Sequence, residues 1–189
     1  FALFSRLPAD PVIEQIRLTP ISLLLFTLKQ DQRTRLLKAL GLRSKPVVST
    51  PGEFWEEYEP DTAGSASIER TNLKVNLVLT TGAAVLSPNE SILSAEESLE
   101  LANNVALQLL KDGPRGLTEP AALEAMLVSV AQTSSVTRRY TPEKLRRVGG
   151  VLSKLNKLLS DPRVDPAGRD AQEILGAASN QLVAATAEL

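Results

Sequence analysis

The most distinctive local sequence is an acidic and aromatic stretch at residues 53–61. It holds the only Trp of the chain, one of its two Tyr residues and five carboxylates. Trp and Tyr are enriched among the residues that dominate binding energy at protein interfaces, and flanking carboxylates suit a basic patch on a partner. The stretch is therefore typical of a docking segment, or else Phe54 and Trp55 fold back onto the helices while the acids stay solvated. The partner-binding residues that we expect here are Phe54, Trp55, Glu56, Glu57 and Tyr58.

The same carboxylates have a spacing that acid–base or metal chemistry can use. Glu53, Glu56 and Glu57 include the i,i+3 and i,i+4 separations that put two carboxylates on one helix face. That spacing is common, however, and no calcium-loop glycine pattern or second acidic cluster completes a site. We interpret these acids as solvated charge and predict no catalytic residue, no metal site and no cofactor.

A second charged cluster surrounds the start of a predicted helix near residue 142. It contains Arg138, Arg139, Arg146 and Arg147, with Lys144 between them. Such a cluster can hold phosphate or an acidic protein face. The net charge of −1 gives no general attraction to nucleic acid, whose binding depends on many accumulated phosphate contacts. We therefore interpret the cluster as a solvated face or as a protein-docking patch to which the four arginines belong, and we disfavour nucleic acid.

The composition excludes several kinds of chemistry. The chain has no Cys and no His, so thiolate nucleophiles, Cys-based zinc or iron–sulfur sites, His-dependent triads and histidine haem ligation cannot be built from it alone. The loop at 113–116 lacks the spacing of a phosphate-binding loop, and no Gly-x-Ser-x-Gly elbow occurs.

The size and apolar content indicate a globular protein of about one domain. Its 189 residues are 43% hydrophobic but only 4% aromatic, which predicts a core of Leu, Val, Ile and Ala. The longest apolar stretch, residues 21–28, is far shorter than a membrane-spanning helix, although peripheral contact with a membrane complex stays open. The chain begins at Phe1, which we interpret as an excised domain or a processed precursor, favouring an organelle or an exported compartment.

Capping residues mark where the helices should begin. In each case a Ser, Thr or Asp stands within two positions of a proline or three residues ahead of a glutamate, and an apolar run with helical spacing follows. The predicted starts lie at Asp10-Pro11, Thr19-Pro20, Ser94, Thr118-Glu119-Pro120, Thr141-Pro142 and Asp165-Pro166.

The first 42 residues read as an arm followed by one helix. Residues 1–18 contain two prolines and a short amphipathic piece. The pattern then predicts a single helix from Thr19 to Leu40, ended by Gly41 in a left-handed conformation. The first half of this helix is apolar almost all round, so it should be enclosed.

The helical periodicity of apolar residues is lost between residues 43 and 92. Pro and Gly interrupt every candidate element in 43–72, which predicts a long irregular loop of the kind that works as a binding segment or a linker. Alternating apolar residues at 73–79, a turn at Thr81-Gly82 and residues 83–86 predict a small β-hairpin.

Residues 93–189 read as a four-helix bundle. Apolar positions alternate at intervals of three and four in each of four segments, and the loops between them are short. We expect an antiparallel up-and-down bundle over 94–188. The fold class is thus mainly α: this bundle, an N-terminal helix, a long loop and a hairpin.

Two adjacent glycines, Gly149 and Gly150, interrupt the strongest of these helical patterns. Each costs about 1 kcal/mol relative to Ala in an exposed helix, so a compensating reason is expected. Either a neighbouring backbone approaches closely there, or the helix kinks.

These features favour a non-catalytic accessory or scaffold subunit that binds and stabilises other proteins in a larger complex. The surfaces expected to do so are the N-terminal arm, the 43–72 loop and the enclosed helix at 19–40. One alternative is a carrier that holds an apolar ligand or pigment in a cavity inside the bundle. The other is an enzyme that relies on carboxylates or hydroxyls alone.

Overall fold

The computed structural model describes residues 19–45, 57–60, 65–86, 93–133, 141–166 and 168–187, and this part of the chain is mainly helical. The predicted N-terminal arm lies outside it. The elements are α1 (Pro20–Thr27), α2 (Gln30–Ala39), β1 (Leu42–Lys45), β2 (Glu57–Pro60), α3 (Ser65–Leu86), α4 (Ala95–Asp112), a 3₁₀ turn η1 (Gly113–Leu117), α5 (Pro120–Thr133), α6 (Pro142–Leu159) and α7 (Arg169–Ala187).

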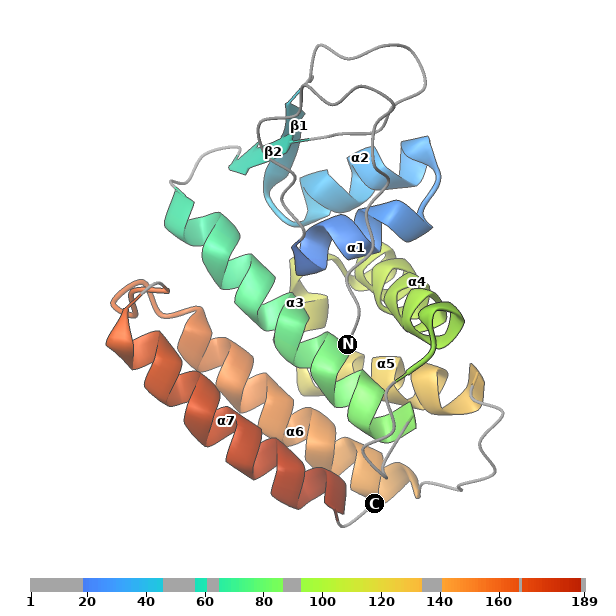
Figure 1. The fold of residues 1–189 in the computed structure, drawn as a ribbon, viewed down its shortest axis with the longest axis vertical. Helices are drawn as coiled ribbons and strands as arrows, with labels where there is room; N and C mark the ends of the chain where they lie inside the picture. The colour runs from blue at the N-terminus through green and yellow to red at the C-terminus, as the bar shows by residue number, and fades with distance from the viewer. Residues whose placement is uncertain are drawn as a thin grey trace.

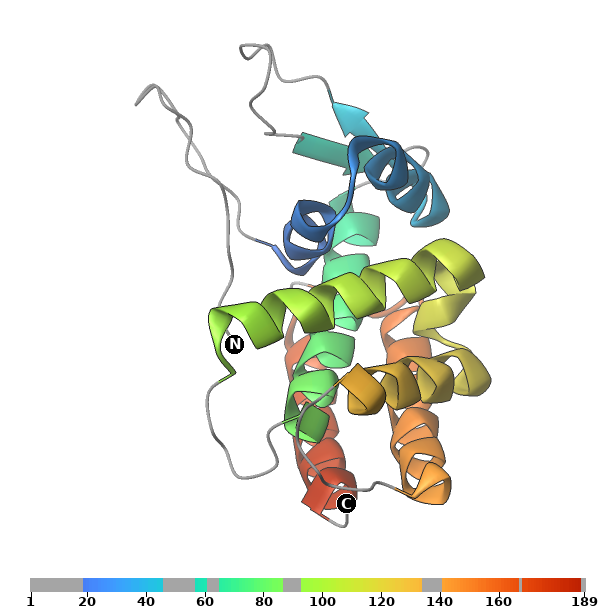
Figure 2. The same cartoon turned by 90° about the vertical axis from the view of Figure 1, so that its right-hand side faces the viewer.

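The helix α3 runs through the middle of the molecule. In Figure 1, α6 and α7 lie on one side of it, and α1, α2 and α4 lie on the other. Figure 2 shows α4 and α5 lying across the direction of α3, α6 and α7. The segments predicted as four helices after residue 93 are therefore helices, but the up-and-down bundle is not confirmed. The antiparallel neighbours α6 and α7 pack side by side, whereas α4 and α5 cross them.

One apolar core joins these helices. It is built mainly from Leu, Val and Ala, and its largest fully buried side chains come from α1 through α5 together with η1. The prediction that the first helix is enclosed is confirmed, because Ile21, Leu23 and Leu24 are 0% exposed. The elements that enclose it are α3 and α4 of the same chain. The buried side of α1 is thus not a surface for another protein.

The predicted single helix at 19–40 is wrong, because the chain breaks at Leu28 and Lys29. Both residues have extended backbones, with ψ angles of 155° and 160°. The break is held by hydrogen bonds: the Lys29 N–H donates to Gln32 Oε1 at 3.0 Å, and Arg33 Nε donates to the Leu28 carbonyl at 2.9 Å. Two short helices at an angle can bury both apolar faces against α4. The predicted stop is confirmed, since Gly41 has a φ of +69°.

The predicted β-hairpin at 73–86 is also wrong, because these residues belong to α3. The buried set Thr71, Val75, Val78, Gly82 and Val85 follows helical spacing. Threonine hydroxyls donate back to the carbonyl four residues earlier, as Thr71 does to Ser67 at 2.9 Å, which satisfies them inside a helix. Because α3 starts at Ser65, the predicted irregular loop is too long at its C-terminal end.

Two short strands replace part of that loop. β1 and β2 pair antiparallel, with Leu42 opposite Pro60 and Lys45 opposite Glu57. This pair lies outside the segment where the hairpin was predicted. β2 contacts α3 and β1 contacts α2, so the pair closes one end of the helical body.

Most of the predicted helix starts are confirmed. Thr19 and Ser22 exchange reciprocal capping hydrogen bonds at the start of α1, and Ser94 and Glu97 do so at α4. Thr141 caps α6, and α5 begins at Pro120. The start predicted at Asp165-Pro166 is wrong by a few residues, because turns occupy residues 161–166 and α7 begins at Arg169. Asp10-Pro11 lies outside the described residues.

The glycine pair in α6 marks a close helix crossing. A Cβ added to Gly149 would lie 3.1 Å from the Glu124 backbone nitrogen of α5, whereas one added to Gly150 would meet nothing within 4 Å. Of the two reasons expected for these glycines, close approach of a neighbouring backbone therefore holds at Gly149.

Two polar side chains of α6 hold the connection between α4 and α5. Asn156 Nδ2 donates to the Leu117 carbonyl at 2.6 Å, and the Ser153 hydroxyl donates to the Thr118 carbonyl at 2.5 Å. Both side chains are buried. These bonds satisfy two carbonyls at the end of η1 and fix α6 against it.

The two glycines provide a matched pair for testing the crossing. Gly149→Ala should lower the free energy of unfolding, because overpacking against backbone costs about 1–3 kcal/mol and outweighs the roughly 1 kcal/mol gained in helix propensity. Gly150→Ala should raise it by up to about 1 kcal/mol. Urea denaturation measures both, and equal effects of the two substitutions would contradict the close approach.

The buried amide gives a second stability prediction. Asn156→Ala leaves the Leu117 carbonyl buried without this donor, which should lower the free energy of unfolding by about 1–3 kcal/mol. Lys157→Ala, on the exposed side of the same helix, should change it by no more than about 0.5 kcal/mol. Thermal and urea unfolding compare the two variants, and a loss for Asn156→Ala as small as that of the control would show that the bond contributes nothing.

Candidate protein-binding groove

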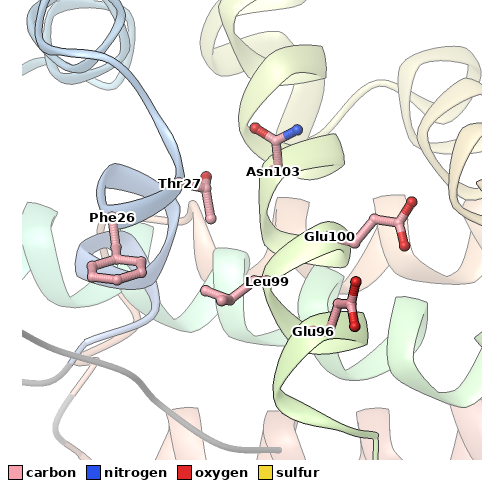
Figure 3. A pocket seen from close by; sticks show the side chains of 6 residues that line it. All are labelled: Phe26, Thr27, Glu96, Leu99, Glu100 and Asn103. Atoms are coloured by element: carbon pink, nitrogen blue, oxygen red, sulfur yellow. The ribbon is translucent and has the colours of Figure 1, made fainter.

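An open groove lies between the end of α1 and the first half of α4. It has a volume of about 680 Å³ and is lined by Phe26, Thr27, Glu96, Leu99, Glu100 and Asn103. Figure 3 shows Leu99 pointing from α4 towards Phe26 on α1, while Glu96 and Glu100 project from the flank of α4. The α1/α4 groove thus has an apolar floor and an acidic rim.

The apolar floor consists of two side chains, one from α1 and one from α4, that lie just outside the fully buried residues of each helix. α1 is apolar almost all round, and the residues that reach α3 and α4 are fully buried, but Phe26 is only half-buried. On α4 the buried stripe includes Ser98, Leu101 and Ala102, and Leu99 stands just outside it, also half-buried. An aromatic ring and a leucine are therefore left facing one another beside solvent.

The rim is negative at neutral pH. Glu96, Glu97 and Glu100 are exposed in the first two turns of α4, and the first basic residue along this helix is Lys111. The backbone N–H and then the hydroxyl of Ser94 hydrogen-bond to Glu97 and lower the pKa of its carboxyl. Acids in a first turn stabilise the helix through its dipole, but Glu100 lies beyond that turn, beside Leu99.

Of the nine residues predicted for partner binding, the structure describes four, and these lie on two separate elements. Phe54, Trp55, Glu56, Arg138 and Arg139 lie outside the described residues. Glu57 and Tyr58 belong to β2, where their backbones pair with Lys45 and Ser44. Arg146 and Arg147 lie near the start of α6, at the far end of the molecule from β2 (Figure 1).

The two arginines of α6 instead belong to a longer positive surface. Five exposed basic residues occupy this helix against one acidic residue, Glu143, and Leu158 on the same surface is 52% exposed. Arg146 Nε forms an ion pair with Glu124 Oε2 of α5 at 3.2 Å. We name this surface the α6 basic face; its basic residues are Lys144, Arg146, Arg147, Lys154 and Lys157.

Most of the groups with shifted pKa values gather elsewhere, where α3 meets the turn between α6 and α7. Arg70 Nη2 donates to the Val164 carbonyl at 2.8 Å and to the Pro162 carbonyl at 3.1 Å. Lys74 Nζ donates to the Ser160 hydroxyl at 3.2 Å, and burial, with the charge of Arg70, lowers the pKa of Lys74. These contacts fix the turn to α3, so we assign them to positioning α6 and α7.

Sequence reasoning missed the groove. The alternation of apolar residues after residue 93 predicts that Leu99 lies in the core seam of a bundle, and the predicted helix at 19–40 places Phe26 on its enclosed half. The signal that could have pointed to this site is the acidic cluster Glu96, Glu97 and Glu100 around a leucine next to that seam. It becomes a site only when α1 is placed beside it.

Comparison of the chain with protein-family models, curated proteins and solved structures finds no match. Over the described ranges, no helix combines the length and the apolar character needed to cross a bilayer. Within those same ranges, no group of three or more acidic residues is arranged to hold a metal ion.

The turn between α6 and α7 gives a pH prediction. Hydrogen bonds from the Arg163 side chain, then from its backbone N–H, lower the pKa of Asp161 from 3.8 to about 2. Because the folded pKa is depressed, the stabilising contribution is present above about pH 3.8 and is lost as the pH falls towards 2.

Carboxyl NMR titration measures this pKa directly. Arg163→Gln should raise the pKa of Asp161 towards 3.8, since the charged donor is gone. Arg169→Gln, which removes the partner of Glu173, should leave Asp161 unchanged. An Asp161 pKa near 3.8 in the unsubstituted protein would show that the Arg163 contact does not persist in solution.

Proposed function

We propose that this chain is a non-catalytic helical module that binds a protein partner through the α1/α4 groove, as an accessory or scaffold subunit of a larger assembly. The observation that carries the proposal is the half-buried pair Phe26 and Leu99, which face one another in an open groove. The neighbouring apolar residues Leu23, Leu24 and Leu101 are almost fully buried. An aromatic and an aliphatic side chain left beside solvent are typical anchors of a protein interface.

The charge around the anchors supports a protein partner over an apolar small molecule. A carrier of an apolar ligand or pigment needs an enclosed cavity lined by apolar side chains. The α1/α4 groove is open, and Glu96 and Glu100 stand on its rim. Carboxylates at the rim of an interface steer a basic partner and select its orientation.

The same geometry does not favour acid–base catalysis. Catalytic carboxylates are tuned by burial and by close neighbours. Glu96 and Glu100 are exposed on a helix surface, where water competes for both. We therefore assign them to recognition.

Site-specific photo-cross-linking tests the proposal. A benzophenone amino acid placed at Phe26 should, in cells that express the protein, give a discrete adduct heavier than the 20.4 kDa chain. The adduct should be lost when Glu96 and Glu100 are both changed to Ala, because the carboxylates that attract a basic partner to the groove are then absent. The matched control carries the benzophenone at Gln172, which is exposed on α7.

The result that contradicts the proposal is equally clear. Position 26 would give no adduct, or it would give the same pattern as position 172. Circular dichroism of each purified variant establishes that the helical fold is retained, so that a missing adduct reports on binding.

A further inference from the structure

The charges of this chain are separated onto different faces although they nearly cancel overall. The chain carries 21 basic and 22 acidic residues. Yet the first two turns of α4 hold three glutamates and no basic residue, and α6 holds five basic residues and one acidic residue. A near-neutral molecule with separated charge attracts copies of itself, because opposite faces of two molecules are complementary.

Each of the two faces also presents an apolar residue among its charges. Leu158 is 52% exposed, one helical turn after Lys154 and next to Lys157. Arg147, Lys154 and Leu158 are separated by seven and four residues, which places them along one stripe of α6.

The groove has the matching pattern with the opposite sign. Glu96 and Glu100 are four residues apart and lie together on one side of Leu99, so both carboxylates stand beside the apolar floor. A leucine beside two lysines on one surface thus corresponds to an apolar floor beside two glutamates on the other.

We propose that the occupant of the α1/α4 groove is the α6 basic face of a second copy of this chain. Leu158 of one copy packs between Phe26 and Leu99 of the next, and Lys154 and Lys157 approach Glu96 and Glu100. This inference rests on the proposed function, since it names the partner of the same groove.

The fold requires this contact to be between molecules. In Figure 1, α3 lies between α6 on one side and α1 with α4 on the other. The α6 basic face and the α1/α4 groove of one copy are therefore separated by α3 and do not meet. The contact joins two different surfaces and is therefore head-to-tail. Such contacts form rings when the rotation closes and open chains when it does not.

The size of the patch sets the strength of the association. A few apolar side chains and exposed ion pairs form a small interface, which is typical of weak and transient contacts. Exposed charges more than about 8 Å apart are largely screened at physiological ionic strength. Association should therefore grow with protein concentration and fall with added salt.

Sedimentation velocity of the full chain tests the proposal with charge reversals. The unsubstituted protein should associate at low salt as its concentration rises towards about 1 mM, the weak end of specific binding. Lys154→Glu with Lys157→Glu should abolish association, and so should Glu96→Lys with Glu100→Lys. An equimolar mixture of these two variants should associate again, because each supplies one face of compatible charge.

Three further variants separate the specific contact from general charge effects. Arg35→Glu with Lys38→Glu makes the same charge change on exposed positions of α2 and should leave association intact. Leu158→Ala should weaken association by about tenfold or less, as expected for one partly exposed apolar anchor. The variant with all four reversals at the two faces should associate like the unsubstituted chain.

Several results would overturn this inference. The chain could stay monomeric up to about 1 mM at low salt, the mixture could fail to restore association, or the α2 control could lose it equally. If the chain is monomeric but position 26 cross-links to a different protein, self-association fails and the proposed function stands. If position 26 cross-links to nothing, the proposed function fails as well.

Discussion

The packing of α3 against its neighbours is the constraint on which the rest of the structure depends. This helix contacts α1, α4, α5, α6, α7 and β2. At Gly82 the missing side chain makes room for Leu101 of α4, whose Cδ1 lies 2.6 Å from where a Cβ would be. At its other end, Arg70 and Lys74 hold the turn between α6 and α7. One helix thereby fixes both the α4 side of the molecule and the α6 side.

Local signals explain what could be predicted from the sequence. The caps at Thr19, Ser94 and Thr141 and the left-handed Gly41 act within a few residues, so the sequence alone indicates where those helices begin or end. The close approach at Gly149 could be anticipated only as one of two reasons for a costly glycine. Choosing between them required the position of Glu124 on α5.

What could not be predicted was decided by contacts between distant segments. The apolar residues at 73–79 satisfy a strand and a helix equally well, and packing on both sides of α3 selects the helix. No Gly or Pro marks the break at Leu28 in the sequence. The break allows the apolar faces of both α1 and α2 to be buried. The groove depends on this break, because α1 must end beside α4 for Phe26 to face Leu99.

The brevity of α1 has a consequence for when the groove can exist. An isolated helix shorter than about 12–15 residues is marginal in water, and α1 spans only 8 residues. Its supports are α3 and α4, which end at Leu86 and Asp112. During synthesis on the ribosome, Phe26 therefore emerges long before α3 and α4, the helices against which α1 packs. The α1/α4 groove can therefore form only after α4 has left the exit tunnel.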